Sequence, residues 1–206
     1  ISIEVSNYPI RGEFGNTHEE DLELNLKKQQ ICYVGAITKE RGINQIIESL
    51  DRVVPSVKFK LGGPIPDKEY MKELKKQKNW HLVDYLGYLD RAQMDQLFKE
   101  SLLGLVTFLP EPNHINSQPN KIFEYMSAGL PVVSSNYPLW KEIIEGSGCG
   151  ICIDPTNPEE ISRAINALLA DPALAKTQGL NGIKSVKNKY NWYSEEEKLL
   201  QLYLDI

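Results

Sequence analysis

Short apolar runs alternate with longer amphipathic segments along the chain from Gln30 onward. The runs are rich in β-branched and aromatic residues, and Gly, Pro, Asn or Asp residues stand near their ends, which is typical of buried strands. We expect six such strands, at residues 30–36, 57–62, 81–86, 103–109, 131–135 and 150–153. Buried strands that alternate with helices predict a parallel sheet covered by helices on both faces.

The segments between the runs show the spacing of helices that bury one face. Apolar residues recur at i, i+3, i+4 and i+7 in two of them. The first set is Ile43, Ile46, Ile47 and Leu50, and the second is Ile161, Ala164, Ile165, Leu168 and Leu169. After residue 171 we expect two more helices, one opened by Asp171-Pro172 and one over 194–205, with a break at Asn191-Trp192. The pattern indicates an α/β, Rossmann-like doubly wound sheet, which binds ligands at the carboxyl ends of its strands.

Composition excludes several classes of protein. The 206 residues include 41% hydrophobic and 25% charged residues, which suits one globular domain. A formal net charge of -5 argues against a nucleic-acid partner. No apolar run approaches the roughly 20 residues of a membrane span, and three cysteines are too few for a secreted disulfide framework, so we expect a cytoplasmic protein. Cys149 and Cys152 have redox or metal-ligand spacing, but they stand in an apolar run and predict strand and core positions.

We expect three regions along the chain. Residues 1–28 combine Asn7-Tyr8-Pro9 with the charged cluster Glu19-Glu20-Asp21, which indicates an interdomain linker or hinge and the least ordered part. Residues 29–190 contain the predicted sheet, and residues 191–206 contain the last helix. The chain begins without a methionine, which suggests a piece of a longer protein.

The loop after the first predicted strand has the features of a phosphate site. Gly35 ends the strand, and Arg41-Gly42 precedes the next helix. A helix N-terminus carries partial positive charge, and an arginine beside it can bind a phosphate through two parallel hydrogen bonds. The glycine fingerprint of dinucleotide-binding proteins is absent, so Arg41 as a solvated surface charge is the alternative.

The strongest signal follows the fourth predicted strand, in a polar loop and the helix after it. Pro119 suits the first helical turn, and Asn120 and Lys121 stand where an anion would meet free backbone N–H groups. Gly129-Leu130-Pro131 stops the helix. Glu124 lies one turn after Asn120 among apolar residues. A carboxylate there needs a partner, either a ribose diol or a neighbouring basic or backbone group.

Two segments together resemble a known family. The first runs from Tyr33-Val34-Gly35 to Arg41-Gly42-Ile43, and the second is NSQPNKIFEYMSAGLPVV, from Asn116 to Val133. They resemble the family-4 (group 1) glycosyltransferases of the GT-B fold, and the likeness extends from Asn7 to the end of the chain. It implies a carboxy-terminal domain that binds a nucleoside-diphosphate sugar, while a separate amino-terminal domain supplies most of the acceptor site. The linker would join the two domains, and the last helix would cross back toward the first.

The resemblance also implies roles for individual residues. Glu124 matches the second acid of an E-x7-E motif, which holds the ribose, and Arg41 matches a basic residue that holds the diphosphate. The chain departs from the family at Asn116, which replaces the first acid of that motif, and at Ala36, where an arginine is common. Asn116 keeps a hydrogen-bonding contact with the donor sugar but cannot carry negative charge. Arg41 and Lys121 are left as the matching cations.

Other residues complete the predicted donor site. Gly87 and Tyr88 resemble the place where the base is held through backbone groups, although Tyr88 equally suits surface packing. His114 either contacts the sugar or phosphate or is solvated, and Glu111 is a weaker substitute for the missing acid. The predicted substrate-binding residues are Glu124, Asn116, Ser117, Asn120, Gly35, Gly87, Tyr88 and His114, and the predicted catalytic residues are Arg41 and Lys121.

These residues predict glycosyl transfer without a metal. No Asp-x-Asp occurs in the sequence, so positive side chains and a helix N-terminus would stabilise the charge on the departing nucleoside diphosphate. No other cofactor is expected. A non-catalytic nucleotide-binding domain and a sugar-nucleotide epimerase of related fold are the alternatives.

The wider role is implied by the resemblance alone. It points to retention of anomeric configuration and to bacterial cell-surface polysaccharide synthesis, of capsule or lipopolysaccharide, with a glycan or lipid-linked acceptor. Any membrane contact would be peripheral, at the inner face, through the missing domain. The residues do not identify the base, the sugar or the acceptor.

Overall fold

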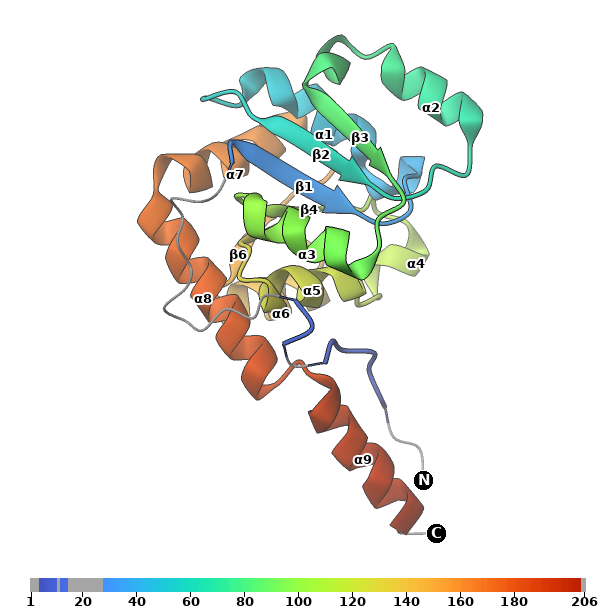
Figure 1. The fold of residues 1–206 in the computed structure, drawn as a ribbon, viewed down its shortest axis with the longest axis vertical. Helices are drawn as coiled ribbons and strands as arrows, with labels where there is room; N and C mark the ends of the chain where they lie inside the picture. Colours follow the sequence, from blue (N-terminus) through green and yellow to red (C-terminus); the bar gives the residue numbers. More distant parts are fainter. Residues whose placement is uncertain (1–3, 11, 15–27, 205–206) are drawn as a thin grey trace.

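The computed structural model describes residues 4–10, 12–14 and 28–204, and these residues form one parallel six-stranded sheet with helices around it (Figure 1). The strands are β1 (Gln30–Val34), β2 (Lys58–Gly62), β3 (Val83–Gly87), β4 (Gly104–Val106), β5 (Val132–Ser135) and β6 (Gly150–Ile153). All six lie within or overlap the predicted apolar runs. The predicted α/β, Rossmann-like fold is therefore confirmed.

The order of strands in the sheet is β3-β2-β1-β4-β5-β6. The chain builds outward from β1 to β3, returns to place β4 beside β1, and then builds outward in the other direction. The loops that follow β1 and β4 consequently leave the sheet toward opposite sides. A crevice opens between such loops at the carboxyl ends of the strands, which is where doubly wound sheets bind ligands.

Helices connect the strands and cover the sheet. They are α1 (Ile43–Ser49), α2 (Lys68–Lys75), α3 (Arg91–Glu100), α4 (Pro112–Ile115), α5 (Asn120–Ser127), α6 (Pro138–Ser147), α7 (Pro158–Ala170), α8 (Pro172–Asn188) and α9 (Trp192–Leu204), with short 3-10 turns at Lys39–Arg41, Leu50–Arg52 and Lys78–Leu82. Figure 1 shows α3 in front of the sheet and α1 behind it. α1 packs on α7, and α5 packs on α8.

The core lies where the sequence pattern predicts it. β1, β4 and β5, which occupy the middle of the sheet, contain only buried residues. The apolar stripe of α1 is buried, and so is that of α7 except for Leu169, which packs at its edge. Cys32 and Cys149 are buried, as predicted, and Cys152 is partly buried on β6. Burial raises the pKa of the Cys149 thiol to about 12 and that of the Cys152 thiol to about 11.

Two predicted strands were too long. β1 ends at Val34 rather than residue 36, and β4 ends at Val106 rather than residue 109. The peptide groups beyond β4 bond outside the strand ladder: the Phe108 carbonyl accepts hydrogen bonds from two side-chain hydroxyls, and the Leu109 N–H donates to the Glu40 carbonyl. Apolar residues can continue past a strand when loop partners satisfy their backbone.

Other boundaries also differ from the sequence prediction. β3 starts at Val83 because residues 78–82 form a 3-10 turn. α4 was not predicted, and α9 begins at Trp192 rather than residue 194. The predicted break is present at Asn191, whose buried side-chain amide donates to the Val186 and Lys187 carbonyls at the end of α8. This amide satisfies backbone groups that the helix end would leave without partners.

The N-terminal segment 4–10 runs beside the start of α9. The Trp192 N–H donates to the Pro9 carbonyl, and the Ser6 N–H donates to the buried carboxylate of Glu195 at 2.9 Å. Tyr8 packs edge-on against Phe123, with ring centres 4.7 Å apart. The predicted linker cluster Glu19-Glu20-Asp21 lies outside the described residues.

Phe14 is fully buried, although the polar residues around it indicated a linker rather than the core. Its ring packs against Phe98 of α3. The division of the chain into a linker, a central domain and a crossing helix remains a prediction. Within the described ranges, none of the helices is long and apolar enough to cross a membrane.

Candidate functional site

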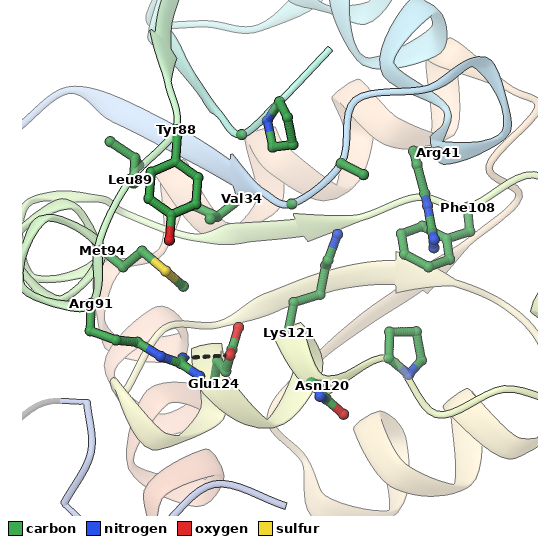
Figure 2. A pocket seen from close by; sticks show the side chains of 15 residues that line it. Val34, Arg41, Tyr88, Leu89, Arg91, Met94, Phe108, Asn120, Lys121 and Glu124 are labelled. Carbon is green, nitrogen blue, oxygen red and sulfur yellow. Dashed lines mark hydrogen bonds and ion pairs between the residues drawn. The ribbon is translucent and has the colours of Figure 1, made fainter. Parts of the chain in front are cut away.

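A cavity of about 490 Å³ lies at the carboxyl ends of β1 and β4, at the point where the strand order reverses (Figure 2). We call it the switch-point cavity. Its lining residues are Val34, Gly35, Ala36, Arg41, Gly63, Pro64, Tyr88, Leu89, Arg91, Met94, Phe108, Pro119, Asn120, Lys121 and Glu124. Six of the ten predicted site residues are among them: Gly35, Arg41, Tyr88, Asn120, Lys121 and Glu124.

The floor of the cavity is made by glycine backbone at the ends of β1 and β2. Gly35 has φ +143° and Gly63 has φ +131°, in a region that L side chains rarely adopt. A Cβ on Gly63 would overlap the Gly35 carbonyl oxygen, and a Cβ on Gly35 would overlap the ammonium of Lys121. The two loops therefore approach each other closely, and Gly35 leaves the space that Lys121 occupies.

Arg41 reaches the cavity from the 3-10 turn that follows β1. Its guanidinium lies 3.8 Å from the centre of the Phe108 ring, which is close enough for a cation–π contact. Phe108 is fixed in turn, because its carbonyl accepts hydrogen bonds from the hydroxyls of Ser135 and Tyr137, each at 2.7 Å. The stacked ring holds the guanidinium at the cavity wall, and Figure 2 shows the two groups overlapping on the side of the cavity beside Lys121.

Lys121 is the most deeply placed cation of the cavity. It occupies the second position of α5, and its ammonium lies 2.9 Å from the Tyr33 hydroxyl and 4.0 Å from the centre of that ring. Burial, reinforced by the positive charge of Arg41, holds the pKa of Lys121 well below its usual range, and Glu124 opposes this shift only partly. Within the described part of the chain, Lys121 forms no ion pair with a carboxylate.

The amino end of α5 faces the same space. The sequence predicted Pro119 in the first turn of the helix, but Pro119 is the N-cap of α5. It has no side chain that could cap the helix. Asn120 is exposed at the cavity edge. The first turn of α5 thus brings backbone N–H groups without helical partners to the cavity, and the partial positive charge of the helix end adds to that of the two cations.

Glu124 stands one turn further along α5 and is 15% exposed. One of its carboxylate oxygens accepts a hydrogen bond of 2.8 Å from Arg91, the first residue of α3. The sequence predicted either a ribose or a neighbouring basic or backbone group as the partner of Glu124, and it did not identify Arg91. A signal for it existed: Asp90 and Gln93 form a capping box, which sets the start of a helix directly after β3 at the same edge of the sheet.

Four predicted site residues do not line the cavity. The ring nitrogen Nδ1 of His114 lies 3.1 Å from the Leu109 carbonyl oxygen, and the ring packs against Phe108. The Ser117 hydroxyl donates to the His114 carbonyl, and the Ser117 carbonyl accepts a hydrogen bond from the Trp140 indole at 2.6 Å. Both residues shape the loop that supports Phe108.

The other two residues lie at element ends. Asn116 is exposed at the carboxyl end of α4. Gly87 ends β3 with φ +69°, and its carbonyl accepts a hydrogen bond from the Gly63 N–H at 2.6 Å.

Tyr88, directly after Gly87, is 79% exposed, and Figure 2 shows its ring over the opening of the cavity. Glu111, the weaker candidate, is exposed at the N-cap of α4.

The cavity combines two kinds of chemistry. Arg41, Lys121 and the α5 terminus form a positive end without a counter-ion among the described residues, which suits an anion such as a diphosphate. Glu124 and Arg91 form a paired, hydrogen-bonding end. In the ranges that the structure describes, no three His, Cys, Asp or Glu side chains are grouped so that they could hold a metal ion.

Comparison with known proteins decides the family. Residues 16–185 match the model of the glycosyl transferases group 1. The chain belongs to this family. An uncharacterised glycosyltransferase of Methanocaldococcus jannaschii is 26% identical over 179 residues, which cover 85% of this chain and 45% of that protein. A capsular polysaccharide biosynthesis glycosyltransferase of Staphylococcus aureus, CapM, is 25% identical over 84% of this chain and 45% of its own length. This group 1 glycosyltransferase chain thus spans about half the length of the curated relatives it matches.

Solved structures show the same fold. HepE of Anabaena, determined in complex with UDP-glucose, superposes with a TM-score of 0.81 at 19% identity, over 98% of this chain and 57% of that one. Sucrose-phosphate synthase of Thermosynechococcus elongatus superposes with a TM-score of 0.76 at 22% identity, over 96% of this chain and 49% of that one. Over most of this chain both structures share its fold, the Rossmann-like architecture of a GT-B half, which confirms the fold-level resemblance noted from the sequence.

Proposed function

We propose that the switch-point cavity binds a nucleoside-diphosphate sugar and that the full-length protein transfers the sugar to a glycan or lipid-linked acceptor. The observation that carries this proposal is Lys121, a half-buried lysine whose ammonium lies against the Tyr33 ring beside Arg41, with no carboxylate partner among the described residues. A buried cation without a counter-ion destabilises the fold unless an anion reaches it. A diphosphate supplies that negative charge at the amino end of α5.

In this proposal the remaining residues contact different parts of the donor. In this proposal Glu124, about one turn along α5 from the positive end, accepts hydrogen bonds from the ribose hydroxyls. Tyr88 covers the side of the cavity near β3, where the base would lie beside Gly87. Asn116 is assigned to the donor sugar by family resemblance. Ser117 and His114 stay candidate substrate-binding residues, with the sugar or the phosphate as the partner of His114, and all three lie outside the cavity lining. UDP is the first nucleotide to test because HepE was solved with UDP-glucose.

Charge stabilisation explains how the chain would promote transfer. When the bond between the anomeric carbon and the diphosphate oxygen breaks, its electron pair stays on the departing nucleoside diphosphate. With the diphosphate in the switch-point cavity, Arg41, Lys121 and the α5 terminus would lie beside that oxygen before the bond breaks, so little reorganisation would accompany the charge. In this proposal no metal bridges the diphosphate, and retention of configuration follows from the family resemblance.

The setting of the reaction is also part of the proposal. Residues 29–190 form the donor-binding domain, and residues 1–28 and 191–206 lead to and from a second domain that supplies the acceptor site. The similarity to the Staphylococcus aureus capsular polysaccharide glycosyltransferase supports a role in cell-surface polysaccharide synthesis. The acceptor domain would also carry any peripheral contact with the inner face of the membrane.

Calorimetric titration of the full-length protein with UDP, GDP and ADP tests the binding step. At least one nucleoside diphosphate is expected to bind, and Arg41→Ala and Lys121→Ala are each expected to weaken it about 10- to 100-fold, since each removes a charge-assisted contact. Lys39→Ala is the matched control, because Lys39 adjoins Arg41 in the same turn but pairs with Glu73 away from the cavity. Equal affinity in all variants would refute the assignment.

A transfer assay separates the proposal from its rivals. With radiolabelled UDP-glucose and extracted cell-surface glycans or lipids, we expect label in the acceptor fraction, and we expect chelation by EDTA to leave the rate unchanged. A non-catalytic nucleotide-binding domain would bind the donor without consuming it. An epimerase would change the sugar without any acceptor.

A further inference from the structure

Arg91 and Glu124 form a wall between two cavities. Besides the switch-point cavity, a second one of about 300 Å³ lies beside it, and Arg91, Asn120 and Glu124 line both. We call the second one the side cavity. Its other lining residues are Asn7, Tyr8, Pro9, Ile10, Glu13 and Trp192, which belong to the N-terminal segment and the start of α9. The Glu124 carboxylate therefore borders open space on two sides.

We propose that Arg91 is a positioning residue for donor binding, which holds the Glu124 carboxylate with one oxygen on its guanidinium and the other directed at the donor ribose. This inference rests on the proposed function, in which Glu124 binds the ribose. Arg91 Nη1 bonds Oε1 of Glu124 at 2.8 Å. Figure 2 shows the second oxygen directed toward the space between Met94 and Lys121, inside the switch-point cavity.

The position of the Arg91 guanidinium is restrained by its backbone and by two side-chain contacts besides Glu124. Asp90 and Gln93 fix the first turn of α3 through a capping box, so the backbone at Arg91 is set. Arg91 Nη2 lies 3.3 Å from a Glu13 carboxylate oxygen, and its guanidinium carbon lies 5.1 Å from the centre of the buried Phe14 ring. A planar group with several fixed contacts can orient a carboxylate, which a freely rotating side chain cannot.

This contact bears on binding more than on folding. The Arg91 side chain is 61% exposed, and exposed ion pairs add little to the free energy of unfolding. Removing Arg91 would instead free the Glu124 carboxylate to turn toward the side cavity or to share its oxygens with water. The ribose hydroxyls would then meet a carboxylate that must first be ordered, and that ordering lowers affinity.

Paired ribo- and deoxyribonucleotides detect this role directly. The full-length protein and its variants are titrated with UDP and 2′-deoxy-UDP, and in parallel with GDP and 2′-deoxy-GDP. The wild type is expected to bind the ribonucleotide about tenfold more tightly, since a hydrogen bond from the 2′-hydroxyl to a carboxylate is lost in the deoxy form. Glu124→Gln is expected to reduce this ratio, and Arg91→Met to lower it below about threefold.

Two further variants distinguish positioning from a general loosening. Arg91→Lys keeps the charge and is expected to recover part of the ratio, whereas Arg163→Met, an exposed arginine on α7, is expected to leave it unchanged. A loosened fold would weaken both nucleotides equally and leave their ratio intact. Urea unfolding of each variant monitors the fold itself.

The outcomes separate the inference from the function on which it rests. If the wild type and Arg91→Met discriminate equally between the two nucleotides, the role of Arg91 is refuted and the proposed function stands. If the wild type binds UDP or GDP but does not discriminate, the ribose contact is wrong, and the role of Arg91 is refuted with it. If no nucleotide binds, both proposals are refuted.

Discussion

The ammonium of Lys121 lies 2.9 Å from the hydroxyl oxygen of Tyr33, and no carboxylate within the described residues pairs with it. The Tyr33 hydroxyl donates its hydrogen to the Ala36 carbonyl at 2.8 Å, so its oxygen is left to accept from the lysine. Burial raises the pKa of Tyr33, which keeps the phenol neutral. Lys121 is therefore supported by dipoles and aromatic faces rather than by an opposite charge. This arrangement stabilises a cation less well than a ligand phosphate would.

We predict that Lys121→Met raises the free energy of unfolding of the ligand-free protein by about 1 to 2 kcal/mol at neutral pH. A methionine fills similar volume without a partly desolvated charge, and replacing ionic groups held away from water with apolar ones is often stabilising. Urea unfolding with an unchanged m-value measures the effect. Lys39→Met is the control, because Lys39 is exposed and is expected to change stability by less than about 0.5 kcal/mol. A loss of stability in Lys121→Met would contradict the argument.

The same substitution has a predictable pH dependence. The pKa of Lys121 in the fold lies well below the ordinary lysine value of about 10.5. Between these two values the unfolded chain binds more protons than the folded one, so this residue makes the wild type more stable as pH rises. The advantage of Lys121→Met is therefore expected to shrink as the pH is raised toward about 10. An advantage that grows with pH would show that the shift has the opposite sign.

Nucleoside-diphosphate binding should take up protons at Lys121. A bound diphosphate beside the ammonium favours its charged form and raises its pKa, so protein that is partly neutral at this site binds a proton with the ligand. Calorimetric titrations of UDP in buffers of different ionisation enthalpy, at several pH values, measure this uptake. It is expected to be larger at alkaline pH and absent in Lys121→Met. Equal proton uptake in that variant would assign the effect to another group.

Much of this site was predictable because its residues stand at positions that the sheet topology brings together. Parallel strands end at one edge of the sheet, so the residues after β1 and β4 meet because these two strands are neighbours. Arg41 and Lys121 follow those strands in the sequence, and both line the switch-point cavity. The buried stripe of α1 was predictable for a similar reason, since its period of 3.6 residues marks one face.

The rest depended on contacts that no periodic pattern encodes. Ser117 occurs within the segment that resembles the family, and His114 lies just before it, yet local hydrogen bonds direct both to the loop beneath Phe108 rather than to the cavity lining. Phe108 was predicted to lie in a strand because it continues an apolar run. A loop whose backbone groups are hydrogen-bonded can contain the same apolar residues as a strand. Arg91 lies 33 residues before Glu124, and their pairing arises only when α3 and α5 are placed in space.

Glycines of similar backbone angle should differ in their tolerance of a side chain. Gly42 has φ +72° and Gly87 has φ +69°, but a Cβ on Gly42 would overlap the Thr107 carbonyl oxygen, whereas a Cβ on Gly87 meets nothing within 4 Å. We predict that Gly87→Ala destabilises the fold by about 1 kcal/mol, from backbone strain alone. Gly42→Ala is expected to cost about 2 to 4 kcal/mol, because overlap adds to that strain. Urea unfolding of both variants provides the comparison, and equal losses would show that the loops relax.

Asn116 should affect sugar transfer without affecting nucleotide binding. It is exposed at the end of α4 and does not line the switch-point cavity, where the proposed diphosphate and ribose contacts lie. UDP or GDP carries no donor sugar, so Asn116→Ala is expected to change its affinity by less than about twofold. If the amide contacts the sugar as the family motif implies, kcat/KM for transfer should fall about 10-fold, which corresponds to one hydrogen bond.

Asn113→Ala is the control for this prediction, because Asn113 carries an exposed amide on the same helix. An unchanged kcat/KM in Asn116→Ala would remove this residue from the site, while a loss of UDP affinity would place it among the nucleotide contacts instead.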